Sequence, residues 1–305
     1  MASPILRSPI TSDLANVTPD LVDVSTPEKL KSYRESLEPI FTLENIIRGK
    51  ENIISYEELD IPGPAGPMRA TIFRPKHQTH PIDEIPGILH IHGGGLATGN
   101  RFLGFTMLDW VESLGAVCLT AEYRLAPEHH QPAQLEDSYA ALQWMSDHAA
   151  ELGFNPRKLV VCGSSAGGNL TAGVTLLARD RSGPQIRGQY ADIAPVRDVD
   201  AAVLANYAFG ERREHADMYT VPMRATNFAG LPPTFIDVGE ADVFRDQDIA
   251  YASALWKDGV STELHVWPGS WHGFDVFVPD APISRRARAA RLEWLRKLLS
   301  VPDGI

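Results

Sequence analysis

A serine flanked by small residues follows a short apolar stretch near the middle of the chain. Residues 158–168 read KLVVCGSSAGG, so Ser165 is the central residue of a G-x-S-x-G pattern. In this pattern the serine lies on a strained strand-to-helix turn, and the flanking glycines keep the neighbouring backbone from colliding. The serine hydroxyl then projects at the positive end of a helix, where developing negative charge is stabilised. The segment therefore predicts that Ser165, rather than Ser164, is a catalytic nucleophile.

Three consecutive glycines end another predicted strand, in residues 88–95, which read ILHIHGGG. Acyl transfer creates an oxyanion that needs N–H donors about 2.7–3.1 Å away. Glycines let the backbone turn its amides toward a substrate, and Ala166, the residue after the nucleophile, supplies a further donor. His92 is expected to organise this loop rather than to act as a base. No Gly-Lys-Ser/Thr follows either glycine cluster, which excludes a phosphate-binding loop.

Three histidines follow Ser165 in the sequence, and one of them suits a catalytic base. A Ser-His-Asp hydrolase with this turn requires the chain order Ser, then Asp or Glu, then His. His272 lies in a loop directly after a predicted strand, where catalytic residues gather. His265 alternates within that strand, and His215 lies in the charged stretch ERREHAD. We therefore expect His272 to be the base.

The acid of the site is expected after the predicted strand 234–238. Asp242 lies in the loop between this strand and a helix that starts near residue 245. Glu240 is the nearest alternative, and Asp246 suits the first turn of the helix, where an acidic side chain is stabilised by the helix dipole. Asp242 would hold the imidazole in the required tautomer and stabilise the imidazolium.

The apolar pattern predicts the scaffold that positions these residues. Short apolar runs cover residues 87–91, 116–120, 158–162, 234–238 and 263–267, after two strands at 53–61 and 68–73 that form an antiparallel pair. Helical patterns lie between and after them, at 135–152, 246–259 and 283–299. Continuous apolar strands alternating with helices indicate a mostly parallel sheet of roughly eight strands with helices on both faces. A further helix is expected from Thr26, an N-cap, with an apolar stripe from Leu30 to Ile40.

Taken together, the motifs resemble those of the hormone-sensitive-lipase branch of the α/β-hydrolases, the family IV carboxylesterases. The resemblance runs from about residue 59 to 299. Its motifs are HGGG (His92–Gly95), YRLAPEH (Tyr123–His129), GSSAGG (Gly163–Gly168), GLPPTF (Gly230–Phe235), EADVFRD (Glu240–Asp246) and HGF (His272–Phe274). Two motifs depart from the family pattern: Ser164 replaces the usual Asp of GDSAGG, and Val243 replaces a proline after Asp242.

The resemblance implies roles for individual residues and a division of the chain. Ser165, Asp242 and His272 would form the catalytic triad, and the amides of Gly94, Gly95 and Ala166 the oxyanion hole. Residues 1–50 and an insertion at about 195–229 would form a small helical cap on a catalytic domain of residues 51–305. The substrate pocket is expected to include Leu96, Tyr207, Phe209 and Trp271. In the family's strand order, one strand separates Cys118 from Cys162, which predicts two buried free thiols rather than a disulfide.

Composition limits the class of protein. The 305 residues carry a formal charge of −11 at a sequence pI of about 5.4, which argues against a nucleic-acid partner. No apolar run reaches the roughly 18 residues of a membrane span, and the N-terminus has no targeting pattern. We expect a cytoplasmic monomer or homodimer that needs neither a cofactor nor a metal.

The sequence thus predicts a serine carboxylesterase for small to medium acyl esters. A lactonase, amidase or acyltransferase would use the same triad, and the sequence does not separate these reactions. A non-catalytic small-molecule receptor on the same scaffold, as in plant gibberellin receptors, is disfavoured because those proteins lack the catalytic histidine. The short, polar insertion (FGERREHADMYT) favours small or aromatic esters over long acyl chains.

Overall fold

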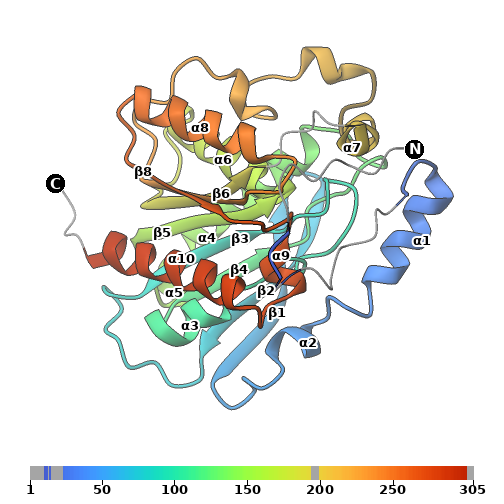
Figure 1. The fold of residues 1–305 in the computed structure, drawn as a ribbon. Coiled ribbons are helices and arrows are strands. Elements are labelled where there is room, and N and C mark those ends of the chain that lie inside the picture. Colours follow the sequence, from blue (N-terminus) through green and yellow to red (C-terminus); the bar gives the residue numbers. More distant parts are fainter. Residues whose placement is uncertain (1–9, 13, 15–22, 194–198, 301–305) are drawn as a thin grey trace.

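The computed structural model describes residues 10–12, 14, 23–193 and 199–300. Within them, eight strands form one sheet in the order β1-β2-β4-β3-β5-β6-β7-β8 (Figure 1). The strands are β1 (Ile54–Gly63), β2 (Gly66–Pro75), β3 (Pro86–Ile91), β4 (Val117–Ala121), β5 (Asn155–Ser165), β6 (Gly188–Ile193), β7 (Thr234–Gly239) and β8 (Thr262–Trp267). Strand β2 pairs antiparallel with both β1 and β4, and all other neighbours are parallel. The predicted α/β-hydrolase architecture is confirmed.

Helices cover both faces of the sheet. The helices of the described residues are α1 (Pro27–Leu37), α2 (Leu43–Ile47), α3 (Leu108–Leu114), α4 (Ala133–Asp147), α5 (Ala149–Leu152), α6 (Ala166–Asp180), α7 (Val199–Phe209), α8 (Arg245–Lys257), α9 (Phe274–Phe277) and α10 (Pro282–Ser300), with 3₁₀ turns at Gly210–His215 and Pro222–Arg224. Helices α3 and α10 pack on one face, where Ile88 and Val160 lie. Helices α4 and α6 pack on the other face against Leu89 and Val161, and α8 joins them there beside β7 (Figure 1). This split follows from the alternation of side chains along each strand.

The sequence patterns did not predict every strand and helix. Strand β6 reads GQYADI and was not among the predicted strands, and α3 was not among the predicted helices. The helix predicted over 135–152 is broken at His148 into α4 and α5. Thr26 caps α1 as expected, but this helix ends at Leu37, and Ile40 of the predicted stripe is 54% exposed.

The two cysteines are buried and free, as predicted. Strand β3 lies between β4, which carries Cys118, and β5, which carries Cys162. Burial raises the pKa of both thiols, so both are uncharged.

The predicted cap falls partly outside the described residues. Positions 1–9, 13, 15–22 and 194–198 are not described, so only parts of the segments 1–50 and 195–229 can be placed. Helix α7 follows β6 and is joined to the N-terminal segment by the Tyr207 hydroxyl, which donates to Val24 O at 3.0 Å. The division into cap and catalytic domain stays a prediction. In the described part of the chain, no helix is long and apolar enough to cross a membrane.

Candidate active site

Ser165 lies at the turn between β5 and α6. Its backbone φ is +59° and ψ is −127°, a conformation that a residue with a side chain rarely adopts. The turn is tightly packed, because a Cβ on Gly167 would lie 2.1 Å from Ile91 O of the neighbouring strand. Only glycine fits there. The strained turn predicted from G-x-S-x-G is therefore present, and strain of this kind clusters at functional sites.

Ser165, His272 and Asp242 form one hydrogen-bonded chain. His272 Nε2 lies 3.0 Å from Ser165 Oγ, and His272 Nδ1 lies 2.8 Å from Asp242 Oδ2. A carboxylate only accepts, so Nδ1 donates to Asp242 and the lone pair of Nε2 faces the serine hydroxyl. Asp242 is 3% exposed, and its other oxygen accepts from the Phe244 amide at 2.9 Å. This arrangement can remove a proton from Ser165.

The loops that carry Asp242 and His272 are tied to each other. The amides of Glu240 and Ala241 donate to Trp267 O and Ser270 O at 2.8 and 2.9 Å. The Glu240 carboxylate accepts from the Gly269 amide at 2.9 Å, so Glu240 holds the loops together. The acid and the base therefore have a fixed separation.

The other sequence candidates lie elsewhere in the fold. His265 pairs with Glu263 on β8, at 2.9 Å, and stacks on Trp267. His215 lies in the exposed 3₁₀ turn after α7. Asp246 pairs with Arg245 in the first turn of α8.

The glycine loop after β3 lies beside the serine. A Cβ on Gly93 would come within 3.5 Å of Ser165 Cβ. Gly94 and Gly95 have φ of +103° and +64°, and the Thr98 amide and hydroxyl fix the loop by donating to Gly94 O at 2.9 and 2.8 Å. Among the described groups, nothing accepts a hydrogen bond from the Gly94 or Gly95 amide. The role of these amides as an oxyanion hole stays a prediction.

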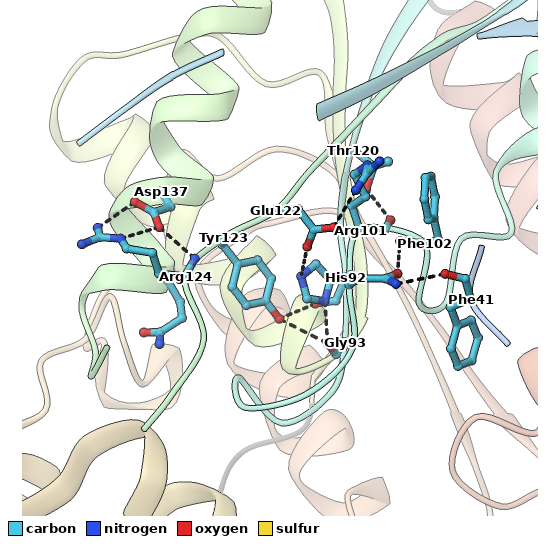
Figure 2. Close-up of polar contacts among 12 residues, drawn as sticks. Phe41, His92, Gly93, Arg101, Phe102, Thr120, Glu122, Tyr123, Arg124 and Asp137 are labelled. Carbon is cyan, nitrogen blue, oxygen red and sulfur yellow. Dashed lines mark hydrogen bonds and ion pairs between the residues drawn. The ribbon is translucent and has the colours of Figure 1, made fainter. Parts of the chain in front are cut away.

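A buried polar network around His92 and Tyr123 holds the glycine loop (Figure 2). The Tyr123 hydroxyl donates to His92 O at 2.9 Å and Gly93 O at 3.2 Å, and its ring stacks on the His92 imidazole at 3.9 Å. His92 Nδ1 donates to Gly93 O at 2.8 Å. Burial lowers the pKa of His92, so its imidazole is neutral and organises the loop, as predicted.

The residues around Tyr123 anchor the network to the sheet and to α4. Arg124 donates to Asp137 on α4 through its amide and guanidinium, at 2.7–3.0 Å (Figure 2). Glu122 accepts from Arg101 at 2.8 Å, and Arg101 Nε donates to Thr71 on β2 at 2.8 Å. The YRLAPEH motif therefore stabilises the glycine loop. Tyr123 bonds the loop directly, and Arg124 fixes the residue next to it to α4.

The expected pocket residues lie in different surroundings. Leu96 and Phe209 are 1% and 4% exposed and belong to the core cluster that contains α4 and α6. Trp271 is 3% exposed and packs with Phe274 in a separate cluster. Tyr207 is half-buried and bonds the N-terminal segment. Their role in substrate binding stays a prediction.

Two contacts to the glycine loop were missed by sequence reasoning. Leu204 on α7 lies against Gly95, since a Cβ on that glycine would be 2.4 Å from Leu204 Cδ1. Arg34 on α1 donates to Ala97 O at 2.7 Å and to Ala126 O at 2.6 Å, and it pairs with Glu128. Neither residue belongs to a motif, so no local pattern indicated them. Among the described residues, no group of three or more His, Cys, Asp or Glu side chains could hold a metal ion.

The fold and the site define an α/β-hydrolase. A family model for the alpha/beta hydrolase fold matches residues 88–203 and 191–276. The chain belongs to this family, in the hormone-sensitive-lipase-like branch that the motifs predict.

Relatives and solved structures agree with this family. Carboxylesterase NlhH of Mycobacterium tuberculosis is 37% identical over 243 residues, which cover 71% of this chain and 75% of that protein. Esterase LipI of the same organism is 34% identical over 264 residues, covering 79% and 82%. The crystal structure of esterase LipW from Mycobacterium marinum is similar at a TM-score of 0.87 and 29% identity, covering 98% of this chain and 100% of that one.

Proposed function

We propose that this protein is a serine carboxylesterase that hydrolyses small to medium acyl esters through an acyl-enzyme on Ser165. The observation that carries the proposal is the hydrogen-bonded chain from Ser165 Oγ through His272 to Asp242. The closeness of the glycine loop to Ser165 supports the proposal as well, because a Cβ on Gly93 would lie 3.5 Å from Ser165 Cβ.

The coarser part of this function follows from the family. The chain is a carboxylic-ester hydrolase, in line with its named relatives, a carboxylesterase and an esterase at 37% and 34% identity. The triad roles, the acyl-enzyme and the size of the acyl group are the proposal. A cytoplasmic location and a monomeric or homodimeric state remain predictions.

The mechanism starts with activation of the serine. His272 Nε2 takes the proton of Ser165 Oγ while the oxygen attacks the ester carbonyl carbon. Asp242 keeps the Nδ1 proton in place and stabilises the imidazolium that forms. The amides of Gly94, Gly95 and Ala166 bind the oxyanion of the tetrahedral intermediate. These hydrogen bonds strengthen as negative charge develops on the oxygen.

Three further proton transfers complete the turnover. The imidazolium gives its proton to the leaving alcohol, the C–O bond breaks, and the acyl group stays on Ser165. A water molecule then gives a proton to His272 and attacks the acyl carbonyl. The second tetrahedral intermediate collapses when His272 returns the proton to Ser165 Oγ, and the carboxylic acid leaves.

The test of this function is the Ser165→Ala variant with a p-nitrophenyl short-chain ester. We expect turnover to fall by several orders of magnitude while far-UV circular dichroism is unchanged, because the nucleophile is lost and the fold is not. Ser253→Ala, at an exposed site on α8, is the matched control and keeps wild-type turnover. Retention of more than a tenth of the activity by Ser165→Ala would contradict the proposal.

A further inference from the structure

A buried arginine outside the active site connects α10 to the strand and helix that adjoin it. Arg291 is 5% exposed, and its Nε and Nη2 lie 2.9–3.1 Å from the carboxylate oxygens of Asp237 on β7. Its Nη1 donates to Asp275 on α9. Both aspartates are buried, at 2% and 6% exposure. The planar guanidinium of Arg291 therefore binds two carboxylates that belong to different segments of the chain.

Each carboxylate belongs to a segment that carries a residue of the proposed triad. Strand β7, with Asp237, leads into the loop of Asp242, and α9, with Asp275, begins directly after the His272 loop. Asp237 also accepts from Trp267 Nε1 at 2.8 Å, and Trp267 is the last residue of β8 before that loop. The acid and base loops are thus connected to the same guanidinium.

The serine turn has a link to the same group. The Arg291 guanidinium carbon lies 4.9 Å from the ring centroid of Tyr190 on β6. The Tyr190 hydroxyl lies 3.3 Å from Oγ of Ser164, the residue next to Ser165. The family usually has an aspartate where this chain has Ser164. The partner of the Tyr190 hydroxyl is therefore a neutral hydroxyl instead of a carboxylate.

The charges make this cluster dependent on the arginine. Burial opposes the charge of Arg291, but Asp237 and Asp275 outweigh it and raise the pKa of Arg291 well above its usual value. Two buried carboxylates face one cation, so removing the cation leaves both uncompensated. Buried ion pairs add little stability compared with well-packed apolar residues, and their better attested role is to fix one geometry.

We propose that Arg291 is a positioning residue for ester hydrolysis: it sets the relative placement of the segments that carry Ser165, Asp242 and His272. This inference rests on the proposed triad. Misplacing reacting groups by about 1 Å can cost on the order of 10²-fold in rate, even from a distant substitution. The effect should appear in kcat and leave KM unchanged, because Arg291 is buried and its guanidinium is already bonded to Asp237 and Asp275.

The experiment compares three variants of the full chain. Arg291→Lys keeps the positive charge but loses the planar guanidinium with its several N–H donors. Asp275→Asn removes the negative charge on α9, keeps an oxygen that can accept from Arg291, and leaves the Arg291–Asp237 pair in place. Arg296→Lys, at an exposed position of the same helix, is the matched control. For each variant, kcat and KM for p-nitrophenyl acetate, the pH profile of kcat/KM and the rate of fluorophosphonate labelling are measured, with circular dichroism to verify folding.

We expect kcat and the labelling rate to fall by about 10- to 100-fold in Arg291→Lys and by a smaller factor in Asp275→Asn, with KM within about twofold. The acidic limb of the pH profile should also shift, because the His272–Asp242 geometry is loosened. Folded variants with wild-type kcat and pH profile would overturn the proposal, and so would loss of folding in both, which would assign the cluster to stability alone. Absence of labelling in the wild-type chain would instead contradict the proposed function.

Discussion

His272 Nε2 lies 3.0 Å from Ser165 Oγ, although 107 residues separate the two in the chain. The distance is that of an N···O hydrogen bond. The sheet order explains it, because β5, β6, β7 and β8 are parallel neighbours and their carboxyl ends meet at one edge. Catalytic candidates from distant segments are thereby brought together.

Asp242→Asn should disable the histidine without removing it. The amide that replaces the carboxylate can donate to Nδ1, which favours the tautomer that places the proton on Nε2. We expect kcat to fall by about 10³- to 10⁴-fold, as when the same change is made in the Ser-His-Asp triad of an unrelated fold. Steady-state kinetics on a p-nitrophenyl ester measure this. The control, Asp246→Asn in the first turn of α8, should keep its rate, and equal losses in both variants would contradict the assignment of the acid.

Gly95→Ala should damage the proposed oxyanion hole. The residue has φ of +64°, where a side chain costs about 1–2 kcal/mol, and the new Cβ would meet Leu204 Cδ1 at 2.4 Å. We expect kcat to fall by about 10²-fold if one amide donor is displaced.

Adding Leu204→Ala to Gly95→Ala should restore part of this loss, because the clash is with a side chain rather than with backbone. Leu204→Ala alone is the control for the double variant. Full activity in Gly95→Ala would show that the Gly95 amide does not bind the oxyanion.

Removing His90 should change the pH dependence of stability. Burial, with a smaller contribution from His92, lowers the pKa of His90 to about 3, so it is neutral in the folded state. The unfolded histidine titrates near pH 6.5. The stability that comes from keeping His90 neutral is complete above pH 6.5 and is lost as the pH falls toward 3, at about 1.4 kcal/mol per pH unit.

The His90→Asn variant should therefore lose less stability between pH 6.5 and 4.5 than the wild type. Urea unfolding at a series of pH values measures the slopes. His77→Asn, at an exposed site, should keep the wild-type slope. A slope for His90→Asn equal to that of the wild type would contradict the effect of burial on the pKa of His90.

Arg34→Met should weaken the attachment of α1 to the glycine loop. The guanidinium donates to Ala97 O and Ala126 O, and both carbonyls would lose this partner. We expect a loss of about 1–2 kcal/mol in the free energy of unfolding. Urea denaturation tests this against Lys31→Met, at an exposed position of the same helix. Equal effects of the two substitutions would show that the contact contributes nothing.

A series of p-nitrophenyl esters from acetate to palmitate tests the proposed acyl range. Gly95 lies against Leu204 of α7, so the space beside the glycine loop is limited. We expect kcat/KM to be highest for acetate to butyrate and to fall with longer chains. A maximum at palmitate would contradict this substrate range.

The sequence predicted the strands of the sheet correctly where their apolar runs are continuous. Strands β3, β4 and β7 are buried along their whole length, and each was predicted. Strand β6 was missed because Gly188 and Gln189 interrupt its pattern, although it pairs with β5 and β7. Its place in the sheet is set by these neighbours, which local propensity does not encode.

In the candidate site, too, local patterns predicted some residues, and contacts between distant segments determine the others. The order Ser165, Asp242, His272 follows from where strands end, and the structure brings all three side chains together. Arg34, Leu204 and Arg291 were not predicted, because their roles arise from contacts between segments far apart in the chain. Nothing in their own neighbourhood marks them.

The most direct measurement is the site at which a fluorophosphonate becomes attached to the wild-type chain, read by peptide mass spectrometry. Ser164 and Ser165 are adjacent, so the fragment spectrum must separate them. We predict one phosphonyl group per chain, on Ser165, and none after Ser165→Ala. A label on Ser164, or an unlabelled wild-type chain that still hydrolyses esters, would contradict the account.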